Sequence, residues 1–76
     1  MQGITITVNT YSGYETEEMP VSFTIGGKTL DVEEVLDRWQ GEGTEYFKLR
    51  ADDKCTYIIR LDKETDEWEL TMMEKG

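Results

Sequence analysis

The chain of 76 residues contains no histidine, one cysteine and one proline. Without histidine, neither a serine–histidine nor a cysteine–histidine catalytic pair can form, and zinc would lack its usual nitrogen and sulfur ligands. The single cysteine, Cys55, excludes an internal disulfide, and its simplest role is that of a small buried thiol. We therefore expect no cofactor and no metal site.

Long hydrophobic segments are also missing. Residues 1–10 carry no basic charge and no long apolar run of the kind found in a signal peptide, and no later run approaches the length that spans a bilayer. A glycine-rich phosphate-binding loop is absent as well. These features, together with the unpaired thiol, predict a cytoplasmic protein.

Basic residues are few. The chain has 17 acidic and 8 basic residues, a net charge of −9, and the bases are scattered singly among the acids. Such a balance repels phosphate backbones and anionic membranes, so we expect neither a nucleic-acid partner nor a membrane partner. The simplest meaning of the acidity is a well-solvated surface; the alternative is an acidic face that meets a basic partner.

Short apolar alternations separated by turn-forming clusters dominate the sequence. Ile4, Ile6 and Val8 alternate with polar residues and predict a strand over residues 3–9. Periodicity then stops, and we expect a loop over residues 10–20, which could be mobile. Alternation resumes at 21–25, where Gly26 and Gly27 follow and predict a hairpin turn.

The segment 31–40 has two interpretations. Val32, Val35, Leu36 and Trp39 share one helical face, and Asp31 could cap a short helix there. The other interpretation is a strand that bends at a bulge near residues 33–34 and continues to Trp39. A helix of this length is marginal without packing, which favours the bent strand.

Three further alternating segments follow, over residues 46–51, 55–61 and 67–72, joined by polar turns. The pattern predicts a single all-β domain over residues 1–76. We expect a small antiparallel meander of five or six strands, folded as an SH3-like barrel or a curled sheet, with an α+β fold as the alternative if residues 31–40 are helical. The predicted core contains the large aromatic residues Phe23, Trp39, Tyr46, Phe47, Tyr57 and Trp68.

Carboxylates are the only abundant catalytic side chains. Asp52 and Asp53 could bind a cation or act as acid and base, but adjacent acids before a lysine are typical of turns. The acids between Asp62 and Glu69 resemble a calcium loop only faintly, because the central glycine and the distal glutamate are missing. We therefore assign no catalytic and no metal-binding residues.

Exposed aromatic residues offer a better functional hypothesis. Tyr11 and Tyr14 lie in or near the predicted loop, and Tyr46 lies on an outer strand face. With the acidic loop residues Glu15, Glu17 and Glu18 they could form a surface that binds another protein or peptide. We expect a non-enzymatic interaction module. The alternatives are an acidic decoy that mimics nucleic acid and, less favoured, an enzyme that uses carboxylates; the oligomeric state stays open.

Several blocks of the sequence together form a distinctive set: YSGY at 11–14, Pro20, VLDRW at 35–39, YFKLRADD at 46–53, YIIR at 57–60 and DEWEL at 66–70. The set resembles a family of short, uncharacterised bacterial cytoplasmic proteins, over roughly residues 11–72. The resemblance implies a bacterial cytoplasmic origin. It transfers no activity, cofactor or catalytic residue.

Overall fold

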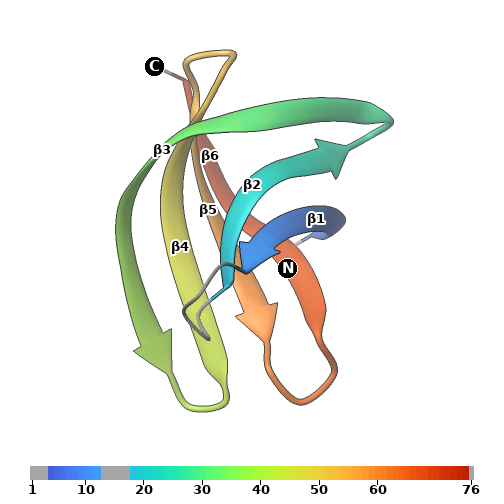
Figure 1. The fold of residues 1–76 in the computed structure, drawn as a ribbon, viewed down its shortest axis with the longest axis vertical. Coiled ribbons are helices and arrows are strands. Elements are labelled where there is room, and N and C mark those ends of the chain that lie inside the picture. Colours follow the sequence, from blue (N-terminus) through green and yellow to red (C-terminus); the bar gives the residue numbers. More distant parts are fainter. Residues whose placement is uncertain (1–3, 13–17, 76) are drawn as a thin grey trace.

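The computed structural model describes residues 4–12 and 18–75, with the side chains of residues 11, 12 and 18 left aside. The described residues form six strands and no helix (Figure 1). The strands are β1 (Ile4–Ser12), β2 (Glu18–Ile25), β3 (Lys28–Gly41), β4 (Thr44–Ala51), β5 (Thr56–Asp62) and β6 (Glu67–Glu74). Among these residues, then, no helix is available to cross a membrane.

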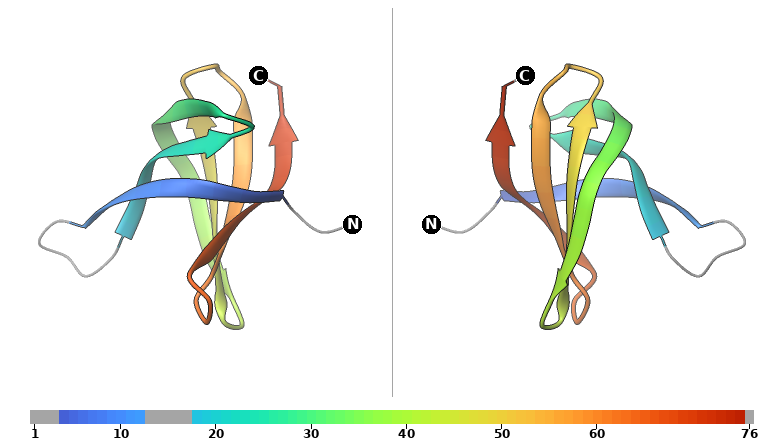
Figure 2. Two further views of the ribbon diagram at one scale, coloured as in Figure 1. Left: turned by 90° about the vertical axis from the view of Figure 1, so that its right-hand side faces the viewer. Right: turned by 90° about the vertical axis from the view of Figure 1, so that its left-hand side faces the viewer.

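Each strand pairs antiparallel with the next, and β1 pairs with β6 to close a barrel. Closure depends on strands that change partner along their length. β1 pairs with β6 over Ile4–Ile6 and with β2 beyond that point, and β3 passes from β2 to β4 after Asp31. Figure 2 shows β1 running transverse to β4, β5 and β6. The all-β prediction is confirmed, and the barrel is consistent with a small SH3-like fold.

The predicted hairpin at Gly26 and Gly27 is confirmed. Both glycines have positive φ, 57° and 81°, as a two-residue type I′ turn requires. This turn matches the right-handed twist of the strands it joins, here β2 and β3. Next to it, the hydroxyls of Thr24 and Thr29 lie 3.0 Å apart across the two strands.

Strand β3 is bent by two bulges, which decides between the two interpretations of residues 31–40. The pairing with β4 shifts between Val32 and Glu34, as predicted, and again between Val35 and Asp37, which was not predicted. Each bulge places two residues of β3 opposite one residue of β4. Val32, Val35 and Arg38 therefore face inward at a spacing of three, whereas Leu36 and Trp39, the other members of the apparent helical face, are exposed.

The second bulge corrects the predicted orientation of Trp39. Arg38 lies opposite the buried Phe47, and Trp39 lies opposite Tyr46 on the outer face. Trp39 is 41% exposed and does not belong to the core, so that prediction was wrong. A single extra residue in a strand moves every later side chain to the opposite face. On the inner side, Arg38 Nη1 lies 3.2 Å from the sulfur of Met19.

The barrel interior is filled by apolar side chains from β1 to β5. Phe23 and Tyr57 meet edge to face with ring centroids 5.0 Å apart, and Phe47 meets Trp68 at 5.6 Å. Tyr46, which the sequence placed both among the core candidates and on an outer strand face, lies outside this core. The buried set is Ile6, Phe23, Leu30, Phe47, Leu49, Ala51, Tyr57 and Ile59.

A further bulge interrupts β6. Ile59 lies opposite Leu70 while Ile58 lies opposite Met72, so Thr71 is the extra residue. Its hydroxyl donates to the carbonyl of Ile58 at 2.9 Å and satisfies a group that the irregular pairing would otherwise leave free. Met72 is consequently turned outward and is 46% exposed, although the alternation from Trp68 placed it on the inner face.

The loop predicted over residues 10–20 is shorter than expected. β1 continues to Ser12 and β2 begins at Glu18, so both ends of the predicted loop are strand. The register of this pair shifts between Asn9 and Thr10, and Pro20 lies opposite Thr10 at that irregularity. A proline fits there because it has no N–H to contribute to a regular ladder. Residues 13–17 lie outside the described residues.

Candidate interaction surface

Two aromatic rings stack on the outside of the barrel. Trp39 on β3 and Tyr46 on β4 are direct cross-strand partners, with ring centroids 5.4 Å apart and planes inclined by 7°. Stacked cross-strand aromatic pairs stabilise a sheet by about 1 kcal/mol. That gain does not remove the indole of Trp39 from water, and exposed tryptophan is typical of protein interfaces.

Local backbone shape makes room for this pair. A Cβ placed on Gly41 would lie 2.7 Å from the hydroxyl oxygen of Thr44 and 3.3 Å from Cε1 of Tyr46. The phenol ring therefore lies against a position that suits glycine because it has no side chain. The ring position is set by three neighbours: Gly41, Thr44 and the indole of Trp39.

The same outer face continues across β5 and β6. Tyr46 lies opposite Arg60, and Arg60 lies opposite Glu69 with an N–O distance of 3.7 Å. Nε of Arg60 is buried and has no hydrogen-bond partner among the described residues. The adjacent outer row contains Lys48, Ile58 and Met72. We call this set the aromatic face: Trp39, Tyr46, Lys48, Ile58, Arg60 and Met72.

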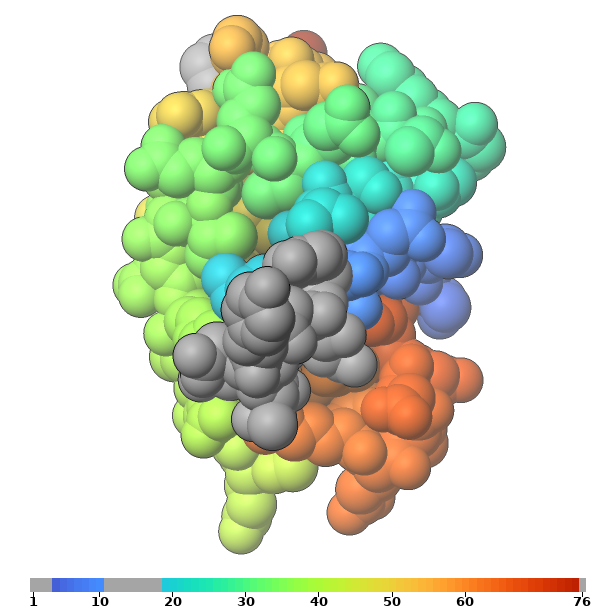
Figure 3. All heavy atoms as spheres, in the orientation of Figure 1, coloured from blue at the N-terminus to red at the C-terminus, as the bar shows by residue number. Residues whose placement is uncertain are grey.

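One end of the barrel is strongly acidic. The β3–β4 and β5–β6 turns project from this end as two prongs (Figure 3), and the Lys63 amide donates to the Gly43 carbonyl at 3.0 Å between them. Six carboxylates and one lysine give this end a charge of −5, out of −9 for the chain. We call it the acidic end; its carboxylates are Glu42, Glu45, Asp62, Glu64, Asp66 and Glu67.

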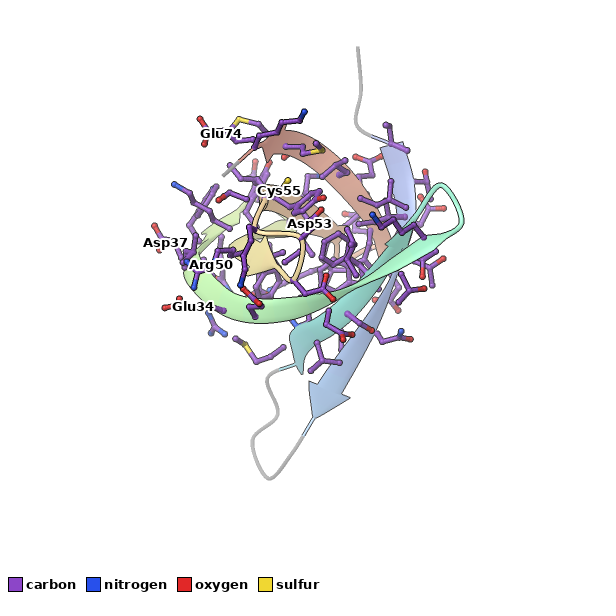
Figure 4. All side chains as sticks on the ribbon, turned by 90° about the horizontal axis from the view of Figure 1, so that it is seen from above. Glu34, Asp37, Arg50, Asp53, Cys55 and Glu74 are labelled. Carbon is purple, nitrogen blue, oxygen red and sulfur yellow. The ribbon has the colours of Figure 1, made fainter. Side chains whose placement is uncertain are left out.

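At the opposite end, two of the carboxylates, Glu33 and Glu34, are paired with bases. Lys54 Nζ pairs with Glu33 at 2.9 Å, and Arg50 pairs with Glu33 at 3.5 Å and with Glu34 at 2.8 Å. The first β3 bulge explains this arrangement because it turns both glutamates toward one arginine. Hydrogen bonding by Lys54 lowers the pKa of Glu33. Figure 4 shows Glu34, Asp37 and Arg50 together on the outside of the barrel.

A hydrogen-bonded pair closes this same end of the barrel. The hydroxyl of Tyr57 donates to Asp53 Oδ2 at 2.6 Å, and Asp53 Oδ1 accepts from the Cys55 amide at 3.0 Å. Figure 4 shows Asp53 and Cys55 lying over the barrel opening. The Asp52 amide donates to the Asp31 carbonyl at 2.9 Å, which holds the turn against β3. The predicted turn role of Asp53 fits this geometry.

The ionisation of this pair argues against proton transfer. The bond from Tyr57 lowers the pKa of Asp53, and burial followed by the nearby carboxylate raises the pKa of Tyr57. A general acid or base needs a pKa near the working pH, whereas both shifts lead away from neutrality. We therefore interpret the pair as a structural latch between the 52–55 turn and the core.

Replacing Tyr57 with phenylalanine should lower the free energy of unfolding by about 1 kcal/mol near neutral pH, because one hydrogen bond is lost. The substitution should also change how the free energy of unfolding depends on pH in the alkaline range. The pKa of Tyr57 in the folded state lies above its ordinary value of 10.0. The latch therefore stabilises the fold fully below pH 10.0, and this stabilisation is lost as the pH rises through the folded-state pKa. Urea unfolding measured across this range should show a weaker decline in the variant; an unchanged decline would contradict the latch.

No metal centre is evident in the part of the chain that the structure describes. No group of three or more cysteine, aspartate or glutamate side chains there is arranged to hold an ion. The acids after Asp62 instead form a turn, in which Asp62 Oδ1 accepts from the Glu64 amide at 3.0 Å. Cys55 is half-buried and packs against the core.

The residues predicted to bind a partner are only partly described. Tyr46 lies on the outer face, as expected, and forms half of the stacked pair. Tyr11 and Glu18 lie on β1 and β2, where only their backbones are described, and Tyr14, Glu15 and Glu17 lie outside the described residues. The sequence reasoning missed Trp39. No local signal in the sequence distinguished its exposed position from a core position.

Comparison with family models, with curated proteins and with solved structures gave no match. The resemblance to short bacterial proteins therefore stays a prediction.

Proposed function

We propose that this chain is a non-enzymatic interaction module that binds another protein or peptide through the aromatic face. The observation that carries the proposal is the stacked pair, in which Trp39 lies outside the core and remains 41% exposed. Tryptophan and tyrosine offer a large contact area at a small cost in side-chain entropy, and interface hot spots are rich in both.

The neighbours of the pair support a binding role. Ile58 and Met72 add apolar area one row away, and Lys48 and Arg60 add donors that a partner could use. An apolar centre with polar groups around it is typical of protein interfaces.

The enzyme hypothesis gains no support from the pairs of acidic residues. Asp53 accepts hydrogen bonds within its own turn, and Glu33 and Glu34 pair with Arg50 and Lys54. Each of these carboxylates has a structural partner. The proposal accordingly assigns no catalytic residue.

Replacing Trp39 with alanine should weaken partner binding by about thirtyfold, equivalent to about 2 kcal/mol, as expected for a hot-spot residue. The fold should survive, since only the outer stacking is lost. Val21 on β2 is also exposed, and Val21→Ala supplies the control.

The test begins with affinity capture from the source lysate on three immobilised proteins: wild type, Val21→Ala and Trp39→Ala. A supporting result is one protein retained by the first two and lost by the third, whose purified form then shifts the amide signals of β3 and β4. Signals that move only on β1 and β2, or equal retention by all three proteins, would contradict the proposal.

A further inference from the structure

We infer that the partner presents an arginine-containing basic segment, which lies over Trp39 and extends toward the acidic end. This inference rests on the proposed function and specifies the chemistry of the partner. It follows from the position of the aromatic face relative to the charges of the barrel.

The acidic end begins one outer row beyond the stacked pair. Trp39, Tyr46 and Arg60 form one row, and the next outward-facing row contains Thr44, Asp62 and Glu67. Two residues along a strand advance about 7 Å, so an extended segment of a few residues would reach both features. The aromatic face and the acidic end therefore form one continuous surface.

The charge imbalance selects a cationic occupant. A charge of −5 is concentrated where the two turns meet, and Lys63 is the only base there. Its ion pair with Glu45 is long, at 3.9 Å, and leaves the other five carboxylates of the acidic end without a described cation partner. Complementary charge steers association and excludes like-charged partners such as nucleic acid. A second copy docking by the same surface would bring two acidic ends together.

The exposed indole favours arginine over other cations. Stacking on Tyr46 covers one face of the Trp39 ring, so its exposed area lies on the other face and the edge. A guanidinium stacks on tryptophan through both cation–π and planar contact, whereas an ammonium makes only the first. Lys48 lies on the side of the pair away from the acidic end and would repel a cation there, whereas Arg60, in the row of the pair, is paired with Glu69 at 3.7 Å. These positions orient the segment toward the turns.

Capped octapeptides provide the probe. One alternates arginine with serine, and the matched peptides carry lysine or glutamate in place of arginine. Binding is measured by the fluorescence of Trp39 in a Trp68→Phe background. The arginine peptide should bind several-fold more tightly than the lysine peptide, and the glutamate peptide should not bind. Equal binding of the arginine and lysine peptides, or binding of the glutamate peptide, would overturn the inference.

Two triple variants distinguish the effect of charge at the acidic end on peptide binding from the effect of the overall charge. Glu42→Gln, Glu64→Gln and Glu67→Gln together remove three exposed charges from the acidic end, and Asp31→Asn, Asp52→Asn and Glu74→Gln remove three exposed charges elsewhere. The first set should weaken binding of the arginine peptide about tenfold and the second less than about twofold. An equal loss in both sets would mean non-specific attraction and would overturn the inference.

The captured partner distinguishes failure of this inference from failure of the proposed function. A partner that is lost with Trp39→Ala but retained by the triple variant of the acidic end would support the interaction module and would contradict a basic segment in the partner. A partner that requires both Trp39 and the acidic end supports the inference.

Discussion

Replacing Phe47 with alanine is expected to remove a large share of the free energy of unfolding of this domain. Phe47 is fully buried in the centre of β4, opposite Arg38 and Ile59, and its ring meets Trp68. Truncation of a buried phenylalanine costs about 3–5 kcal/mol, because apolar contact is lost and a cavity remains. A chain of 76 residues has a total stability of only about 4–11 kcal/mol.

Urea unfolding followed by circular dichroism measures this effect. Leu36→Ala is the matched control, since Leu36 is the extra residue of the second β3 bulge and is exposed. The control should lose less than about 1 kcal/mol. If Phe47→Ala were as mild as Leu36→Ala, the interior would not be where the structure places it.

Replacing Gly27 with valine should destabilise the β2–β3 hairpin by about 2 kcal/mol or more. Gly27 has φ of 81°, a left-handed conformation that costs an L-residue about 1–2 kcal/mol and a β-branched residue more. No atom lies within 4 Å of a Cβ built at Gly26 or at Gly27. Any loss therefore reports the backbone conformation and not a steric clash.

The adjacent position provides the control. Asparagine before glycine is the preferred sequence of a type I′ turn, so Gly26→Asn should leave the thermal unfolding midpoint unchanged or raise it slightly. Both variants are compared by calorimetry under one set of conditions. Equal losses at the two positions would contradict the assigned turn type.

Regular parts of this barrel follow from the sequence. Phe47, Leu49 and Ala51 alternate on β4 and are all buried, and the turns at 26–27 and 52–54 lie where their residues place them. These features depend on local chemistry, namely side chains that alternate in a strand and glycine or aspartate in a turn. The all-β class was therefore predictable from short segments.

The bulges limited the prediction. An extra residue in β3 or β6 is defined by the register of the neighbouring strand, and that register is set by the closed barrel and not by nearby sequence. The first bulge could be expected from the adjacent acids Glu33 and Glu34, which turn toward Arg50. The second bulge has no such signal, and it turned Trp39 from a predicted core residue into an exposed one.

The sequence predicted the type of candidate surface better than it predicted the residues that form it. Aromatic residues beside negative charge indicated a partner-binding face, and Tyr46 was assigned to the outer face from its alternation with Phe47. Its stacking partner could not be identified, because the size and hydrophobicity of Trp39 suit a core equally well. The acidic end combines two turns about twenty residues apart, which only the closed barrel brings together.

Collisional quenching of the two tryptophans by acrylamide tests the exposed aromatic face most directly. Trp39 is observed alone in Trp68→Phe, and Trp68 alone in Trp39→Phe. With Trp39 outside the barrel and Trp68 packed on Phe47, the first variant should be quenched more steeply at every acrylamide concentration. Equal slopes, or a steeper slope for Trp68, would show that Trp39 is not the exposed ring on which the binding surface depends.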